Sequence, residues 1–377
     1  MHDDGVGDFI MTSSAIREIR RIYPDAYITL MVFPRSHSMA ECCPYVDELL
    51  LCLPSNDDWA NILSSYLWAV DFAKILLRRR FDICYCFSHY GYSALLMYMS
   101  GAKIRISRNF YIKGKGDMDN PVYDIYHLLS TDSVPRQDIN GVDHFLALIE
   151  HVLHARVTNR DLEAWYTPFD KTVAKMALLN VKRPIYALCM GSTSPKRKYS
   201  PEKYAKLIEM ILDEDSMVTI VILGGGEADL RYFEIFINAL DERFYNRVLN
   251  FTNRLTYRQS AAVLSMCEMY IGNNTGTMHI AAAVKCPVLQ PNCCPADLPD
   301  QSLRDTQSTS PYRVPSVLVQ PKHALPECAV NEPYHSYGCR AEIPHCITQI
   351  APETIFKGFH LLKERIAQNK IEPLYIC

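Results

Sequence analysis

Residues 272–283, Gly-Asn-Asn-Thr-Gly-Thr-Met-His-Ile-Ala-Ala-Ala, decide the fold class of this chain. The apolar run before them, residues 266–271, predicts a short buried strand, and residues 278–284 are rich in good helix formers. The polar residues therefore occupy a turn from a strand to a helix. The first amides of a helix have no partner within the helix and carry partial positive charge, so such a turn can hold phosphate oxygens.

Two glycines and two threonines in this turn suit an anion site. Gly272 and Gly276 let the backbone come close to a ligand, while Thr275 and Thr277 can cap the helix or hydrogen-bond a phosphate. The same residues could also form a well-capped helix that binds nothing. The turn alone leaves both interpretations open.

The bulk composition predicts a globular protein of two domains. A chain of 377 residues is too long for one ordinary core, and 49% hydrophobic with 21% charged residues is typical of a soluble fold. A net charge of -3 gives no overall bias toward nucleic acid. No apolar run reaches the roughly 18 residues that span a bilayer, and the first residues lack the pattern of a signal peptide. We therefore expect a cytoplasmic protein.

The 14 cysteines are scattered along the chain, several of them inside apolar strands, which favours reduced thiols over a disulfide framework. One cluster near the C-terminus could bind zinc, but it has no Cys-x-x-Cys pair, so free thiols are the favoured interpretation there. The members of this cluster are Cys328, Cys339, His345 and Cys346.

Strands and helices alternate along most of the chain. The N-terminal residues 1–8 form a Gly-rich loop that opens a helix at 9–23, and no strand precedes it, so we expect the numbered chain to lack its first strand. The strands expected after it cover residues 27–33, 47–53, 81–87, 102–106, 184–190, 217–223, 248–251, 266–271 and 287–289. The expected helices cover residues 38–43, 59–80, 93–99, 144–153, 202–212, 228–240 and 352–368.

Such alternation predicts an α/β fold with two doubly wound, Rossmann-like arrays, whose polar loops lie at the carboxyl ends of parallel strands. Residues 109–141 read as irregular acceptor-side loops and 158–182 as the passage between the arrays. The run Arg78-Arg-Arg80 at the end of one helix suits a helix C-terminus, and a basic patch for an anionic membrane surface is the alternative.

Three motifs together resemble glycosyltransferase family 9, the family of the ADP-heptose:lipopolysaccharide heptosyltransferases. They are Gly5-Val-Gly-Asp-Phe-Ile-Met-Thr-Ser-Ser14, the loop from Gly191-Ser-Thr to Lys196-Arg-Lys-Tyr-Ser-Pro-Glu202, and Gly272-Asn-Asn-Thr-Gly-Thr-Met-His279. The resemblance implies a GT-B architecture with an interdomain cleft and no required metal or cofactor, the nucleotide-sugar being a substrate. The implied domains are an acceptor-side domain at 1–165, a donor-binding domain at 166–350, and a C-terminal helix at 351–377 that packs back on the N-terminal domain.

In this resemblance Asp8 matches the family's catalytic base, and Gly7 belongs to the acceptor-side loop. A carboxylate can take the proton of an attacking sugar hydroxyl, an effect worth about 10²–10⁴-fold. A helix N-cap is the alternative role for Asp8. The residues that match donor-binding positions are Ser192, Thr193, Arg197, Lys198, Glu227, Asn274, Thr275, Gly276, Thr277 and His279.

Two positions depart from the family pattern. Asn274 stands where an Asp is usual, which keeps hydrogen bonding but removes a charge and leaves the identity of the donor open. Arg197 replaces a phosphate-binding Lys, a milder change because both cations bind phosphate.

We therefore expect an inverting glycosyltransferase that moves a sugar, with heptose as the candidate, from a nucleotide diphosphate-sugar to a lipopolysaccharide or other cell-envelope glycan. The expected partners are an ADP-heptose-like donor and a glycan or glycolipid acceptor, with peripheral contact at the inner face of the membrane and no nucleic acid. Two alternatives remain open from sequence: a GT-B sugar-nucleotide epimerase or hydrolase, and a non-catalytic sugar-nucleotide-binding protein.

Overall fold

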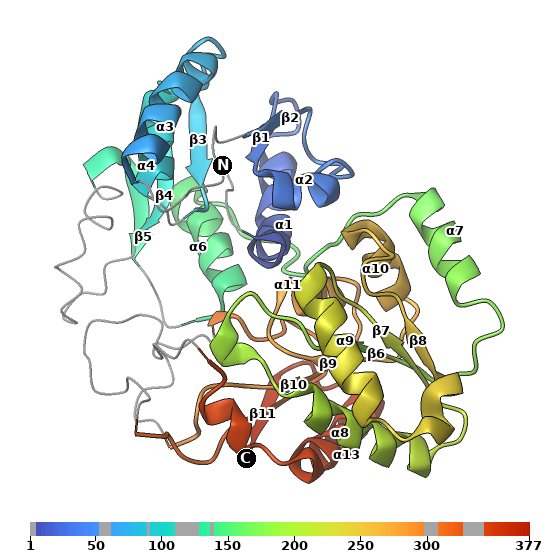
Figure 1. The fold of residues 1–377 in the computed structure, drawn as a ribbon. Helices are drawn as coiled ribbons and strands as arrows, with labels where there is room; N and C mark the ends of the chain where they lie inside the picture. Colours follow the sequence, from blue (N-terminus) through green and yellow to red (C-terminus); the bar gives the residue numbers. More distant parts are fainter. Residues whose placement is uncertain are drawn as a thin grey trace. The chain divides into compact units, whose positions relative to one another are not determined.

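The computed structural model describes residues 5–52, 62–88, 91–109, 128–135, 139–297, 308–326 and 343–377 (Figure 1). The chain divides into two compact units, residues 1–160 and 161–377. Cys328, Cys339 and most of the expected acceptor-side loop segment lie outside the described residues. No helix within the described ranges has both the length and the apolar character needed to cross a membrane.

The first unit contains parallel strands flanked by helices. Helix α1 packs against α6, and α3 packs against α4. Strand β1 pairs with β2, and β3, β4 and β5 form a second sheet in that order. The elements are α1 (Val6–Ile22), β1 (Thr29–Val32), α2 (Pro34–Ala40), β2 (Glu48–Leu51), α3 (Ile62–Leu77), β3 (Ile83–Cys86), α4 (Gly91–Met99), β4 (Ile104–Asn109), β5 (Asp132–Pro135) and α6 (Gly141–Leu153).

The second unit is built on a seven-stranded parallel sheet in the order β12-β11-β10-β9-β6-β7-β8. Its strands are β6 (Ile185–Cys189), β7 (Thr219–Ile222), β8 (Val248–Asn250), β9 (Met269–Gly272), β10 (Val288–Pro291), β11 (Ser316–Val319) and β12 (Pro373–Ile376). Its α-helices are α7 (Pro168–Ala177), α8 (Pro201–Glu214), α9 (Glu227–Ala239), α10 (Tyr257–Leu264), α11 (Gly276–Ala283) and α13 (Pro352–Ala367). The alternation expected from sequence is confirmed as an α/β fold.

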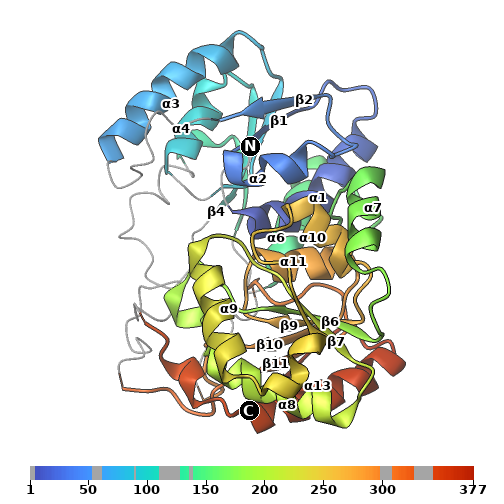
Figure 2. The same ribbon diagram turned by 45° about the vertical axis from the view of Figure 1, so that its right-hand side comes forward.

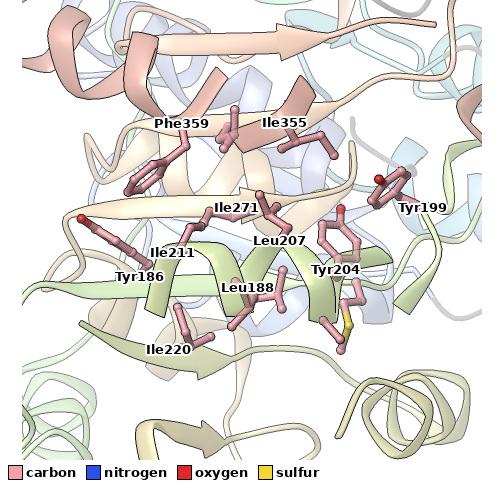
Figure 3. Close-up of a cluster of buried hydrophobic side chains, with 14 of the residues drawn as sticks. Tyr186, Leu188, Tyr199, Tyr204, Leu207, Ile211, Ile220, Ile271, Ile355 and Phe359 are labelled. Carbon is pink, nitrogen blue, oxygen red and sulfur yellow. The ribbon is translucent and has the colours of Figure 1, made fainter. Parts of the chain in front are cut away.

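Helices cover the sheet of the second unit on both faces, as a parallel sheet requires (Figure 2). Helices α8, α9 and α13 share one side, and α10 packs with α11 on the other. Figure 3 shows the core beneath α8 and α13, where Leu207 and Ile211 of α8 and Phe359 of α13 meet the strands. Its members, including Leu188 and Ile271, are almost entirely buried.

Helix α13 packs on the second unit. Its apolar face, with Ile355, Phe359 and Leu362 buried, contacts β10, β11 and α8. A Cβ atom on Gly358 would lie only 3.1 Å from Leu289 Cδ1, so the absence of a side chain there allows the helix to approach the sheet closely. These contacts place α13 on the sheet of its own unit, and packing of the C-terminal helix on the N-terminal domain stays a prediction.

We expect Phe359→Ala to lower the free energy of unfolding of the second unit by about 3–5 kcal/mol, since the substitution leaves a cavity in a close-packed core. Urea unfolding followed by tryptophan fluorescence and circular dichroism measures the change. The matched control is Phe169→Ala, at a ring that is 70% exposed on α7. The control should stay within about 0.5 kcal/mol of the parent protein. Equal losses in the two variants would contradict the packing described for α13.

Candidate functional site

The sheet order of the second unit creates a switch point between β6 and β9. From β6 the chain proceeds outward through β7 and β8, and from β9 it proceeds the other way through β10, β11 and β12. The carboxyl ends of the two central strands are adjacent, because Cys189 is in register with Gly272. Loops leave such a point toward opposite faces of the sheet and open a crevice where ligands of doubly wound folds bind.

Asn273, which is fully buried, fastens the two loops of the switch point together. Its side-chain Nδ2 donates to the carbonyl of Met190 at 2.6 Å, and its Oδ1 accepts from the hydroxyl of Tyr204 at 2.9 Å and from the backbone N–H of Tyr199 at 3.2 Å. Gly272 is required beside it, because any Cβ there would collide with the carbonyl oxygen of Cys189. The geometry of both loops is therefore set by buried hydrogen bonds.

The loop after β6 brings hydroxyl and cationic groups to this point. Ser192 Oγ accepts from the backbone N–H of Ser194 at 3.2 Å and donates to the carbonyl of Asn274 at 3.5 Å, a second link between the loops. Thr193 is exposed. A short 3₁₀ turn, Pro195–Arg197, then places Arg197 and Lys198 in succession, both partly exposed.

The loop after β9 leads into α11, whose N-cap is Thr275. The Thr275 side chain makes no capping hydrogen bond, so this hydroxyl does not cap α11. Gly276 and Thr277 are the first two residues of the helix, where backbone N–H groups have no partner within it. Anion binding by these amides remains available, in agreement with the pattern expected at residues 272–283.

Asn274 is 5% exposed and only half satisfied. Its Nδ2 donates to Thr309 Oγ1 at 2.7 Å, whereas its Oδ1 has no hydrogen-bond partner among the described residues. A buried, unpaired acceptor is costly, roughly 1–3 kcal/mol. The Oδ1 atom is therefore a buried acceptor whose hydrogen-bonding capacity is unused among the described residues.

His279, on α11, is buried and held neutral. Burial, with a smaller contribution from the positive charge of Arg197, lowers the pKa of His279 to about 3. The electrostatic effect of Arg197 shows that the loop after β6 and helix α11 converge. His279 cannot supply a positive charge near neutral pH, so the cations of this site are Arg197 and Lys198.

The first turn of α9, which follows β7, contributes an acid, Asp229, that the sequence did not single out. Asp229 Oδ2 accepts from the backbone N–H of Gly225 at 2.8 Å. A Cβ atom at Gly224 would lie 2.7 Å from the same oxygen, and a Cβ at Gly191 would collide with this carboxylate as well. Burial raises the pKa of Asp229. Glu227, the acid that the family resemblance indicates, is the first residue of α9 and is exposed.

The model of glycosyltransferase family 9 (heptosyltransferase) matches residues 69–290, more than half of the chain. This chain belongs to glycosyltransferase family 9. The match confirms the family resemblance and makes the protein a glycosyltransferase; it includes the second and third motifs, whereas Gly5–Ser14 lies before its first residue.

Individual relatives of this family 9 glycosyltransferase are distant in sequence. Lipooligosaccharide heptosyltransferase 2 of Haemophilus influenzae is 28% identical over 120 residues, which are 32% of this chain and 34% of that protein. Lipopolysaccharide heptosyltransferase 2 of Escherichia coli is 22% identical over 298 residues, covering 75% of this chain and 79% of that protein. The solved structure of E. coli ADP-heptose LPS heptosyltransferase II has a TM-score of 0.68 at 18% identity and covers 98% of this chain and 99% of its own. The likeness shows the GT-B fold.

The remaining expected site residues of the family 9 glycosyltransferase lie in the first unit. Asp8 is the third residue of α1 and is partly exposed. Gly5 is the N-cap of α1, so the alternative role of Asp8 as the N-cap is excluded. Gly7 is buried beside it. Asp8 is therefore an acid in the first turn of α1.

We expect acid to destabilise the second unit through His279. Below the unfolded pKa of about 6.5 the unfolded chain binds a proton that the buried imidazole does not, so stability falls as the pH drops toward 3. Compared with His279→Gln, the parent protein should lose roughly 1 kcal/mol of unfolding free energy per pH unit below about 6. Urea unfolding at pH 7, 6, 5 and 4 measures this difference. A His279 imidazole that titrates near pH 6.5 by NMR would contradict the assignment.

Proposed function

We propose that this protein is an inverting transferase that moves a sugar from a nucleotide diphosphate donor to a lipopolysaccharide or related cell-envelope glycan. The observation that carries the proposal is the switch-point site of the second unit, where Arg197, Lys198 and the start of α11 lie on loops after adjacent strands. The relatives named above are heptosyltransferases, and one solved relative is named for ADP-heptose. An ADP-heptose-like donor is accordingly the first candidate.

In this proposal the second unit binds the donor. The diphosphate lies against the amides of Gly276 and Thr277, and Arg197 and Lys198 offset the charge that develops on the leaving group. Ser192, Thr193 and Thr275 supply hydroxyls, His279 packs as a neutral group behind the phosphates, and Glu227 binds the ribose. Because protein cations and amides supply the positive charge, the reaction needs no metal ion, and activity should persist in EDTA.

The first unit supplies the base and receives the acceptor. As the acceptor hydroxyl oxygen bonds to the anomeric carbon, the bond from that carbon to the diphosphate breaks, and the hydroxyl proton passes to the Asp8 carboxylate. Attack from the face opposite the leaving group inverts the anomeric configuration. Asp8 suits this role because it is a partly exposed carboxylate at the start of α1. Both units are needed, since Asp8 and the donor loops belong to different ones.

We expect Asp8→Asn to reduce kcat by about 10²–10⁴-fold with little change in nucleotide affinity, because the substitution removes the base and leaves the donor loops intact. Acceptor-dependent release of nucleoside diphosphate measures kcat, and calorimetric titration with ADP measures affinity. Asp25→Asn, at an exposed position beyond the end of α1, makes the same change in charge and is the matched control. Undiminished turnover in Asp8→Asn would exclude Asp8 as the base, and release of nucleotide without any acceptor would favour a hydrolase.

Asn274 is proposed to tune the choice of donor. Its unpaired Oδ1 can accept a hydrogen bond from a sugar hydroxyl, while the Nδ2 is engaged by Thr309. Asn274→Asp keeps the acceptor, loses the donated hydrogen bond and introduces a charge, so we expect the ratio of kcat/KM values between two nucleotide-sugars to change about tenfold or more. Parallel assays with ADP-, UDP- and GDP-sugars measure that ratio. An unchanged ratio, with each rate altered equally, would remove Asn274 from donor selection.

A further inference from the structure

Helix α3 is apolar on its outer face as well as on the face that it buries. Ala69, Phe72, Ala73 and Leu76 are buried against the first unit. Leu67, Val70 and Leu77 follow one another at helical spacing on the opposite side, and they are 61%, 41% and 50% exposed. One buried face is sufficient to attach a helix to its domain. The outer row is therefore not explained by the fold.

The exposed row continues onto α4. The side chain of Leu77 lies beside Gly101, where a Cβ would be only 3.1 Å from Leu77 Cδ2. Gly101 closes the turn after Tyr98, to whose carbonyl its N–H donates at 3.2 Å. The Tyr98 ring is 52% exposed, and the Arg105 guanidinium lies 5.4 Å from its centre. We call the exposed side chains of Leu67, Val70, Lys74, Leu77, Arg78 and Tyr98 the α3 patch.

Positive charge exceeds negative charge around these apolar side chains. Lys74 is exposed on α3 and pairs with the exposed Asp71 at 2.7 Å, and Arg78, Arg80 and Lys103 are exposed beyond the end of the helix. Residues 67–107 contain six basic residues against two acidic ones, although the whole chain carries a net charge of -3. The triple arginine directly follows the end of α3, as the helix C-terminus interpretation expects, and the membrane interpretation stays a prediction. Arg79 is structural, since it pairs with Glu48 of β2 at 2.6 Å, whereas the side chains on either side of it face solvent.

We infer that the α3 patch docks the first unit on an anionic lipid bilayer. Leu67, Val70 and Leu77 would enter the boundary between headgroups and acyl chains, and Arg78 and Arg80, just beyond the last residue of α3, would reach lipid phosphates. A nucleic acid would use the positive charge but not the aliphatic row. The inference rests on the proposed function in one respect: a glycolipid acceptor presents its sugar at such a surface, and the patch belongs to the proposed acceptor-side unit.

The test is sedimentation of the full chain with vesicles of phosphatidylcholine and phosphatidylglycerol (3:1), compared with pure phosphatidylcholine. We expect binding to the anionic vesicles that weakens in 0.5 M salt. Arg78→Ser/Arg80→Ser should weaken it about 25-fold, at about fivefold per basic residue. Leu67→Ser/Val70→Ser should weaken it about tenfold. Both pairs are solvent-exposed, so circular dichroism should show unchanged folding. Equal binding of the parent protein and both pairs would overturn the inference.

Helix α7 provides matched controls, because it also exposes apolar and basic side chains. Phe169 and Met176 are 70% and 72% exposed, and Lys171 and Lys175 are exposed on the same helix. Phe169→Ser/Met176→Ser and Lys171→Ser/Lys175→Ser should bind the anionic vesicles like the parent protein. Loss of binding in these variants, with binding kept by the α3 variants, would move the contact to α7 and overturn the inference.

Turnover separates this inference from the proposed function. With a delipidated, soluble acceptor the α3 variants should keep the parent kcat/KM, and Asp8→Asn should keep parent binding to vesicles. Absent vesicle binding together with normal turnover on the soluble acceptor would overturn the lipid contact alone. Vesicle binding by a protein that shows no transferase turnover supports the lipid contact and contradicts the proposed activity.

Discussion

The buried amide of Asn273 is the constraint on which the switch-point site depends. Loops at the carboxyl ends of two neighbouring strands tend to separate, because they lead to helices on opposite faces of the sheet. Here one side chain bonds to the loop after β6 through Met190 and Tyr199, and to helix α8 through Tyr204. Every partner is buried, so removal of the amide would leave polar groups in the core without hydrogen-bond partners. These hydrogen bonds of Asn273 therefore help to position Arg197, Ser192 and the start of α11.

The groups near Asn273 differ in charge: His279 is buried and neutral, whereas Arg197 and Lys198 are positively charged and partly exposed. Burial lowers the pKa of His279 and keeps its ring neutral, and the positive charge of Arg197 opposes protonation as well. The site thus keeps its positive charge on side chains that reach solvent, where a diphosphate can meet them, and keeps the group behind them neutral. The Oδ1 atom of Asn274, which has no hydrogen-bond partner among the described residues, belongs to the same site. The arrangement suits a ligand with an anionic middle and a hydroxyl-rich end.

Elements with strong periodicity could be predicted from sequence, and those set by tertiary contacts could not. Strands β6 and β7 are continuous apolar runs, and α8 begins at Ser200-Pro201, so both kinds of element were identified close to their true bounds. Strands β5, β11 and β12 and helices α7 and α10 were missed. Strands β5 and β12 contain proline and few β-branched residues, so pairing in the sheet rather than their composition makes them strands. The side chains of the donor loops followed from motif resemblance, whereas Asn273 and Asp229 act through spatial neighbours that spacing does not reveal.

The carboxylate of Asp229 lies against both Gly191 and Gly224, and this contact limits which residues can replace either glycine. Gly191 and Gly224 lie on different loops, yet the same side chain forbids a Cβ at both positions. Neither glycine can be replaced alone without moving Asp229, and losing Asp229 would relax both positions at once. The three positions should therefore change together across the family, as one unit of covariation, even where the ligand that binds above them stays the same.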